Sequence, residues 1–436
     1  MGMIETLVPR FRTLQPEMLS RRKFYALSRN DRGALRLARL NILWKKAATG
    51  SRYYAALIRE RHLPPGFTSL EEFQALVPIT PKAAVRADPA AFRLAGRRRG
   101  TWMLTGGSTG APTRVFWALT GHLESLRDQY FARGWWGVHT FDRMAMLWGH
   151  SHSFGRGIAG FSRKLMVPVI DRLRNRMRFS AYQLDAPTLQ RYYDAMARFG
   201  PASLYAYGSA AHLLACANRG RQPLPQPLKV AFLAAEPILE MFRESIYEVL
   251  GCPCAGEYGS IECGMIAYEH PLGMYRVFER SVIVETVPAE TGYEIIVTQL
   301  RHTGFPLFRY EIGDVAPTPL ARGPNGWDTL STIRGRSHDL LRSPAGAVCH
   351  GEALTHIIER IPDVLLFSVV QKATYNLVIQ IQTKSGADIS PNAANWIKSN
   401  VQRLLGNDVP VDVTSVKAEE RTLAGKHRWI VSEVGE

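Results

Sequence analysis

The sequence has no long hydrophobic run, few cysteines and a shortage of acidic residues. No apolar stretch approaches the ~20 residues of a membrane-spanning helix, so we expect no membrane span. The first residues lack the apolar centre of a secretory signal, because Arg10, Arg12 and Arg21 interrupt them. The five cysteines form no pattern typical of a secreted disulfide framework. These absences predict a cytoplasmic protein with reduced thiols.

Acidic side chains are outnumbered by basic ones. The chain holds 54 Lys and Arg against 38 Asp and Glu, a formal net charge of +16. Such an excess attracts polyanions, and the alternative is a solvated basic surface that only raises solubility. No zinc-finger spacing, basic zipper or helix-turn-helix signature accompanies it, so we expect no nucleic-acid partner. We expect part of the excess to steer nucleotides and phosphorylated carriers.

The spacing of apolar residues divides the chain into three regions. Residues 1–95 have mainly helical spacing. From residue 119 to 257, short apolar runs alternate with amphipathic helices, which predicts a mostly parallel α/β sheet with ligands at the carboxyl ends of its strands. The expected strands there are 144–148, 203–207, 229–234 and 252–257. After residue 270 strands dominate, one of them over 307–309, and the last hundred residues form a compact α+β unit.

A loop rich in glycine and hydroxyl side chains lies between two apolar runs and is expected to join two strands. Its glycines allow consecutive N–H groups to converge on one anion, and its hydroxyls add donors. The loop residues are Thr105, Gly106, Gly107, Ser108, Thr109 and Gly110. Donors without carboxylates suit a polyphosphate, and a Ser/Thr/Gly-rich hairpin is the alternative. No Gly-Lys-Ser/Thr ends the loop, so it is not the Walker pattern.

Further polar clusters follow in order along the chain. They are Ala234-Ala235-Glu236-Pro237, Tyr258-Gly259-Ser260-Ile261-Glu262, Arg309-Tyr310-Glu311-Ile312-Gly313-Asp314, Gly335-Arg336-Ser337-His338-Asp339 and Arg421-Thr422-Leu423-Ala424-Gly425-Lys426. Together with the loop, these motifs resemble those of the adenylate-forming superfamily of acyl- and aryl-CoA synthetases. The sequence looks most like the phenylacetate–CoA ligase branch with its capsule-biosynthesis and coenzyme F390 synthetase-like relatives. The resemblance covers roughly residues 40–430, and the segment Val77-Pro78-Ile79-Thr80-Pro81-Lys82 is similar to that branch's lead-in.

The resemblance implies an α/β fold with two domains. The large N-terminal domain of layered sheets and helices is expected over 1–335, with 1–95 as its helical lead-in. A small mobile α+β domain is expected over 336–436. The resemblance implies that this domain rotates between two half-reactions about a hinge at His338 and Asp339.

The resemblance also implies roles for individual residues. ATP is expected to contact the loop residues Thr105, Gly106, Gly107, Ser108, Thr109 and Gly110, the adenine-flanking residues Ala235, Glu236, Tyr258 and Gly259, and the ribose- or phosphate-binding residues Asp314 and Arg336. Lys426, Glu262 and Arg336 are the expected catalytic residues, and Glu262 is the expected Mg²⁺ ligand. The expected acyl pocket consists of His152, Phe154, Tyr205, Tyr207, Gly208 and Ser209, next to Ala235, and suits an aryl or short aliphatic acid.

The implied function is ATP-dependent activation of a carboxylic acid as an acyl-adenylate, with pyrophosphate release and transfer to CoA. The alternatives are transfer to an amine, a carrier-protein thiol or a sugar, and a non-catalytic nucleotide-binding homologue. The expected partners are therefore a small-molecule carboxylate and CoA or another acceptor; a homodimer stays open.

The sequence departs from the family's pattern at several motif positions. The lysine of the loop is replaced by Ala111, the Thr or Ser before the acid is Ile261, and the hinge aspartate is His338. The Cys-Pro-Cys-Gly metal-site segment that many relatives carry near residue 320 is absent. Zinc bound by Cys252, Cys254, Cys263 and His270 stays an alternative to buried thiols.

Overall fold

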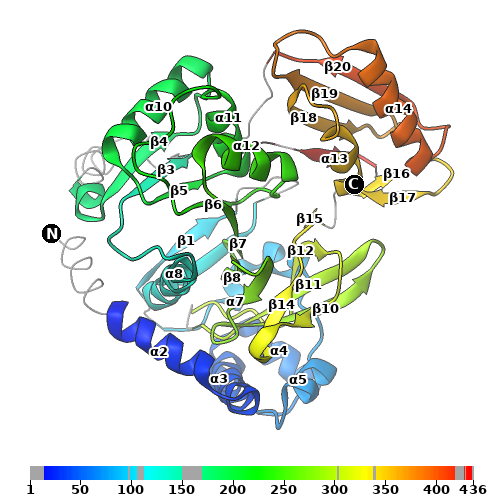
Figure 1. The fold of residues 1–436 in the computed structure, drawn as a ribbon. Coiled ribbons are helices and arrows are strands. Elements are labelled where there is room, and N and C mark those ends of the chain that lie inside the picture. The colour runs from blue at the N-terminus through cyan, green and yellow to red at the C-terminus, as the bar shows by residue number, and fades with distance from the viewer. Residues whose placement is uncertain are drawn as a thin grey trace, which may run out of the picture. The chain divides into compact units, whose positions relative to one another are not determined.

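A computed structural model of the protein describes residues 14–96, 99–105, 112–149, 169–301, 304–336, 340–417, 427 and 429–434. The chain forms two compact units, which are described separately below (Figure 1). The first unit is Met1–Trp135 with Tyr258–Thr332, and the second is Trp136–Glu257 with Ile333–Glu436. The domain boundary expected near residue 335 stays a prediction.

The described part of the first unit begins with helices. They are α2 (Leu14–Ala26), α3 (Arg29–Gly50), α4 (Arg52–Glu60), α5 (Leu70–Leu76), α6 (Lys82–Ala87) and α7 (Pro89–Phe92). Serine N-caps set the start of α3, α4 and α5: the side chains of Ser28, Ser51 and Ser69 each accept a hydrogen bond from the backbone N–H three residues later. Residues 14–96 are mainly helical, with longer non-helical connections over 61–69, 77–81 and 93–96.

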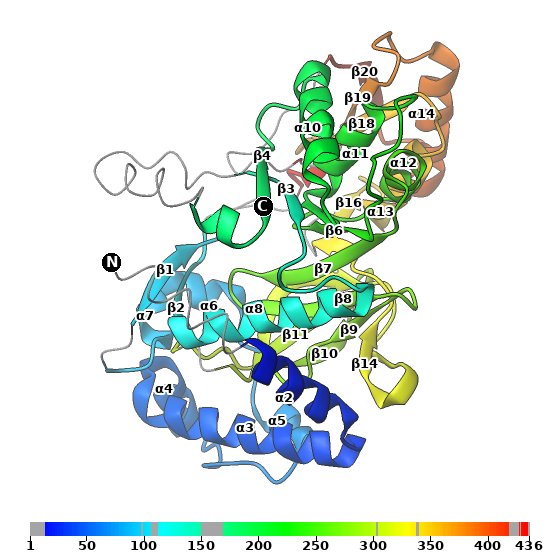
Figure 2. The same ribbon diagram turned by 60° about the vertical axis from the view of Figure 1, so that its left-hand side comes forward.

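The strands of the first unit are antiparallel. Strands β1 (Gly100–Leu104) and β2 (Arg114–Ala118) form a hairpin, and β10 (Val282–Ala289), β11 (Gly292–Gln299) and β12 (Tyr310–Ala316) form a sheet in that order. Strands β8 (Gly264–His270), β9 (Met274–Val277), β14 (Asp328–Leu330) and β13 (Ala321–Arg322) are neighbours in the order given. Helix α8 (Leu119–Arg133) packs along β8 (Figure 2).

The second unit contains the parallel sheet that the sequence predicts. Its strands are β7 (Cys254–Ser260, which ends in the first unit), β6 (Val230–Ala234), β5 (Ser203–Ala206), β3 (Met144–Trp148) and β4 (Arg176–Ser180), in that order. Helices α10 (Ala186–Phe199), α11 (Gly208–Cys216) and α12 (Glu240–Leu250) connect consecutive strands. This arrangement places the ends of β3, β5, β6 and β7 at one edge, where polar side chains follow.

The last part of the second unit is an α+β layer. Strands β20 (Val411–Ser415), β19 (Leu377–Thr383), β18 (Val364–Gln371) and β21 (Ile430–Ser432) form one sheet in that order, and helix α14 (Pro391–Leu405) packs along it (Figure 1). Strand β15 (Gly335–Arg336), the hairpin β16 (Leu340–Arg342) and β17 (Val348–His350), and helix α13 (Glu352–Ile358) precede this sheet.

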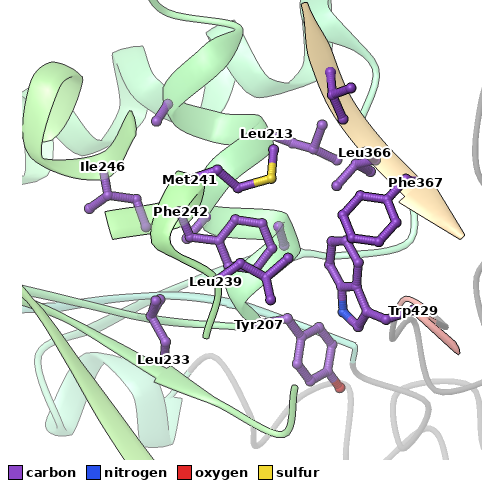
Figure 3. Packing of buried hydrophobic residues seen from close by; sticks show 14 of the residues in the cluster. Tyr207, Leu213, Leu233, Leu239, Met241, Phe242, Ile246, Leu366, Phe367 and Trp429 are labelled. Carbon is purple, nitrogen blue, oxygen red and sulfur yellow. The ribbon is translucent and has the colours of Figure 1, made fainter. Parts of the chain in front are cut away.

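A hydrophobic cluster joins the two parts of the second unit. Phe242 of α12 lies 5.4 Å from Trp429, measured between ring centroids, and Trp429 lies 5.1 Å from Phe367 of β18. Figure 3 shows these rings with Leu239, Met241, Leu213 and Leu366 around them. Segments nearly 200 residues apart in the sequence therefore share one core.

The expected α/β fold class is confirmed, with corrections in detail. The strand expected over 307–309 is wrong, because β12 begins at Tyr310. Arg309 has a φ of 44°, held there while its guanidinium pairs with Glu285 at 2.9 Å and donates to the Val77 carbonyl oxygen at 2.6 Å. None of the described helices combines the length and the apolar character that crossing a lipid bilayer requires.

Candidate active site

The β1–β2 hairpin carries the stem of the Gly/Ser/Thr loop, as the sequence predicts. Thr105 N–H donates to the Thr113 carbonyl oxygen at 3.0 Å, and Thr113 N–H donates to Thr105 Oγ1 at 2.8 Å. The Thr105 hydroxyl therefore closes the stem. The expected phosphate-binding residues Gly106, Gly107, Ser108, Thr109 and Gly110 lie outside the described residues.

Helix α6 contributes two cations to the surroundings of this stem. Arg86 Nε donates to Thr113 Oγ1 at 3.2 Å, and Lys82 Nζ lies 3.3 Å from Glu262 Oε1. Residues four apart on a helix point in the same direction. The sequence analysis named Lys82 without giving it a role and missed Arg86. The spacing of four residues between the two was the signal that could have indicated a shared helix face. Arg86 thus brings positive charge to the stem of the loop, whose sequence has Ala111 in place of the family's lysine.

Glu262 is buried and held by several contacts. Its side chain pairs with Lys82, and the Tyr310 hydroxyl donates to Oε1 at 3.4 Å. Burial, reinforced by the nearby charge of Glu262, raises the pKa of Tyr310, so that this hydroxyl stays a donor. The Trp117 indole N–H donates to the carbonyl oxygen of Ile261 at 2.6 Å and fixes the preceding residue.

The donor set around Glu262 fits a hard cation only when a nucleotide supplies further oxygens. Among the described residues, no three His, Cys, Asp or Glu side chains form a group that could hold a metal ion. A single carboxylate beside substrate phosphates and water is a usual environment for Mg²⁺. Cys252, Cys254, Cys263 and His270 therefore form no zinc site with the described side chains, and burial raises the pKa of the Cys263 thiol.

The expected nucleotide-binding residues Tyr258 and Asp314 are brought together. The Tyr258 hydroxyl donates to Asp314 Oδ2 at 3.0 Å, and both side chains are buried. Asp314 lies within β12, one residue after Gly313, which has a φ of +77°. The backbone of Gly264 comes close to Gly259, because a Cβ at Gly259 would lie 2.5 Å from the Gly264 carbonyl oxygen. Backbone geometry thus fixes the positions of both polar residues.

The expected acyl pocket residues that the structure describes lie in the second unit. Trp148, at the end of β3, stacks on Tyr205 at 4.9 Å and contacts the tilted ring of Tyr207 at 4.1 Å, both distances measured between ring centroids. The Tyr205 hydroxyl donates to Glu257 Oε1 at 2.8 Å. The sequence analysis missed Trp148 and Glu257, although both end strands of the expected sheet. His152 and Phe154 lie outside the described residues.

Gly208 and Ser209 begin α11, and Glu236 lies against that end of the helix. A Cβ on Gly208 would lie 3.0 Å from the Phe242 ring. The Ser209 N–H donates to Glu236 Oε2 at 2.9 Å, and the His427 N–H donates to Glu236 Oε1 at 2.8 Å. Ala235, the residue before, has a φ of +68°.

The expected site residues thus fall into two groups. Thr105, Tyr258, Gly259, Glu262 and Asp314 belong to the first unit, and Tyr205, Tyr207, Gly208, Ser209, Ala235 and Glu236 belong to the second. The backbone of Arg336 lies in β15 of the second unit. His338, Asp339 and Lys426 lie outside the described residues.

Comparison with known proteins connects this arrangement to characterised folds. Protein CapK of Staphylococcus aureus is 23% identical over 424 residues, which cover 93% of this chain and 90% of CapK. The solved structure of 2-hydroxyisobutyryl-CoA ligase in the postadenylation state, in complex with R3-HIB-AMP, has a TM-score of 0.70 at 16% identity, covering 93% of this chain and 91% of that one. An anthranilate CoA ligase in complex with anthranoyl-AMP has a TM-score of 0.53 at 15% identity and covers 77% of this chain and 67% of its own. No protein-family model matches the sequence.

These similarities extend over nearly the whole chain and agree with the order of motifs in the sequence. The suspected resemblance is confirmed at the level of the fold: the chain has the fold of the adenylate-forming CoA ligases.

Proposed function

We propose that the protein is an ATP-dependent carboxylate ligase that forms an acyl-adenylate and then transfers the acyl group to CoA. The observation that carries this proposal is the buried Tyr258–Asp314 pair in the same unit as Glu262, Lys82 and the stem of the loop. The fold supports the same function, since the similar solved structures are CoA ligases in complex with acyl-adenylates.

In the first half-reaction, an oxygen of the substrate carboxylate attacks the α-phosphorus of ATP. The bond to the β-phosphate breaks, and pyrophosphate leaves with the electron pair. Negative charge is spread over the phosphate oxygens, so catalysis depends on positioning and charge neutralisation. We assign phosphate binding to the loop N–H groups and hydroxyls with Arg86 near its stem, and ribose binding to Asp314. Lys426 is assigned to the α-phosphate, and Arg336 to ribose or phosphate.

Glu262 is the residue assigned to hold Mg²⁺. When bound, the ion would neutralise phosphate charge. Lys82, which pairs with Glu262 in this structure, supplies a positive charge at the same carboxylate. The Tyr310 hydroxyl donates to the same oxygen of Glu262, Oε1, and helps to orient the carboxylate.

In the second half-reaction, the CoA thiol gives up its proton to solvent, its sulfur attacks the acyl carbon, and AMP leaves with the electron pair of the broken C–O bond. The acid is assigned to the pocket at Tyr205, Tyr207 and Ser209, whose aromatic wall includes Trp148. Flat apolar rings suit an aryl or short acyl group. CoA is assigned as the acceptor because the similar solved structures are CoA ligases.

The test is pyrophosphate release across a panel of carboxylic acids, measured with and without CoA, an amine and a carrier-protein thiol. We expect release with at least one acid and thioester formation only with CoA. Asp314→Asn and Glu262→Gln should each lower release by about a hundredfold or more, while Glu71→Gln, an exposed carboxylate on α5, should leave it unchanged. Wild-type release in both folded site variants would overturn the proposal. Transfer of the acyl group from the acyl-adenylate to another acceptor would overturn only the assignment of CoA as the acceptor, and adenylation would stand.

A further inference from the structure

Glu236 connects two segments of the second unit that lie far apart in the sequence. One carboxylate oxygen accepts the N–H of Ser209, the second residue of α11, at 2.9 Å. The other accepts the N–H of His427, 191 positions from Glu236 in the chain, at 2.8 Å. Each oxygen of this carboxylate therefore has its own backbone donor.

The first of these bonds supplies a cap that α11 lacks locally. Its N-cap residue, Tyr207, makes no side-chain capping hydrogen bond. The unpaired N–H groups at a helix start favour an anionic acceptor, and Glu236 provides it from the loop after β6. The preceding Ala235 takes a left-handed φ of +68°, a conformation that is unfavourable for a residue with a side chain. The chain thus accepts local strain beside this carboxylate.

The second bond ends on a segment that is fixed from its other side as well. His427 is buried, and its Nε2 lies 2.7 Å from the Phe367 carbonyl oxygen in β18, so Nε2 carries the ring proton. The His427 ring lies 4.1 Å from the Trp429 ring, which packs on Phe367 and Phe242 (Figure 3). His427 is therefore held by its ring contacts and by Phe367 on one side, and by the Glu236 carboxylate at its backbone N–H.

We infer that Glu236 is a positioning residue for adenylation: it sets the register of His427, the residue bonded to Lys426, against the first turn of α11. This inference rests on the proposed function, in which Lys426 acts on the α-phosphate and Ser209 belongs to the acyl pocket. One carboxylate then couples the pocket helix to the strand segment that follows the lysine. The second half-reaction depends less on this link, because the attack by sulfur is at the acyl carbon and no substitution takes place at the phosphorus.

The test compares Glu236→Gln with wild type in both half-reactions. The amide keeps one acceptor oxygen and turns an NH₂ group toward the remaining N–H, so only one of the two backbone bonds survives. We expect single-turnover adenylation at saturating ATP to slow by about tenfold or more, with less than about a twofold change in ATP affinity and in the rate at which supplied acyl-AMP reacts with CoA. Amide hydrogen exchange at His427 should become faster.

Asp185→Asn is the matched control. Asp185 caps α10 by accepting hydrogen bonds from the Thr188 N–H and the Thr188 hydroxyl, both at 2.9 Å. Asparagine caps a helix about as well as aspartate, so this variant should change thermal stability little and leave both half-reactions unchanged. Where Glu236→Gln does not fold, Glu236→Asp serves in the same assays, because it keeps the charge and shortens only the reach.

The possible outcomes separate this inference from the proposed function. Equal slowing of both half-reactions, or weaker ATP binding with an unchanged adenylation rate, would overturn the positioning role; the latter result would make Glu236 an adenine contact. Unchanged kinetics in Glu236→Gln would also overturn it. Failure of the wild-type protein to release pyrophosphate with any acid would instead reject the proposed function.

Discussion

At the scale of single residues, close backbone approach determines which side chains the site tolerates. The position of Gly259 beside the Gly264 carbonyl oxygen leaves no room for a Cβ. Gly259→Ala should lower the free energy of unfolding by about 1–3 kcal/mol, because backbone has to move to accept the methyl group. Denaturant unfolding monitored by circular dichroism measures this change.

Gly134→Ala provides the control for this substitution. Gly134 has a φ of −62°, and nothing lies within 4 Å of a Cβ placed there. The variant should be neutral or more stable by about 0.4–1 kcal/mol, because alanine restricts the unfolded chain. Equal effects at the two glycines would contradict the steric argument.

Arg86 is the second residue whose surroundings lead to a prediction. Its guanidinium donates to Thr113 at the loop stem, where Ala111 removes the family's lysine. Arg86→Met should raise the KM for ATP by about tenfold, the effect of losing one charge-assisted contact. Steady-state pyrophosphate release measures it, with the exposed Arg61→Met as control. An unchanged KM for ATP would remove Arg86 from the phosphate site.

At the scale of elements, helix α11 is joined to β18 through a buried histidine. His212 Nε2 lies 2.9 Å from the Leu365 carbonyl oxygen, and Nδ1 lies 2.7 Å from Ser245 Oγ. Burial is the largest cause that lowers the pKa of His212 to about 4, and the charges of Lys384 and Arg219 act in the same direction. The histidine is therefore neutral in the folded protein at neutral pH.

This lowered pKa predicts a pH dependence of stability. Between pH 6.5 and about 4 the unfolded chain binds a proton at His212 that the folded chain does not, so stability is lost as the pH falls through this range, by up to about 3 kcal/mol. His212→Gln keeps a donor toward Leu365 and removes the titration. Its urea midpoint should change less between pH 7 and pH 5 than that of the wild type. Identical changes in both proteins would refute this assignment.

Strands were predicted from the sequence where apolar runs are unbroken, and a strand such as β4, whose run is interrupted by arginines, was missed. The runs at β3 and β6 are buried and were found, whereas β4 alternates arginines with apolar residues because it is the edge strand of its sheet. The start of β12 was misplaced because side-chain contacts of Arg309 hold its backbone away from an extended conformation. Such tertiary effects leave no periodic signal in the sequence.

The candidate site was predicted where residues belong to motifs and missed where folding assembles them. Tyr258 and Asp314 were singled out separately, and the structure joins them by a hydrogen bond across 56 positions of chain. Arg86, Trp148 and Glu257 carry no motif of their own, and their contacts exist only after the chain has folded. A single sequence contains no pairwise information from which these contacts could be inferred.

At the scale of the whole molecule, the proposed half-reactions differ in their need for Lys426. Lys426→Ala should slow adenylation by about a hundredfold or more, because its charge acts on the phosphorus undergoing substitution. Supplied acyl-AMP should be consumed with CoA at near the wild-type rate. Single-turnover measurements of both steps test this, with Lys372→Ala, an exposed lysine on a surface salt bridge, as control. Equal slowing of the two steps would exclude a role specific to adenylation.

The ring cluster that joins the two parts of the second unit also has a spectroscopic consequence. Trp429 is buried against Phe242 and Phe367, and the imidazole of His427 lies near enough to quench its fluorescence. Any event that separates the 333–436 segment from α12 would move this indole into water, with a red shift and a change in intensity. The difference between wild-type and Trp429→Phe emission isolates this one signal among nine tryptophans. The protein thus contains an intrinsic optical reporter at this packing surface, and its rearrangements can be followed in real time without a label.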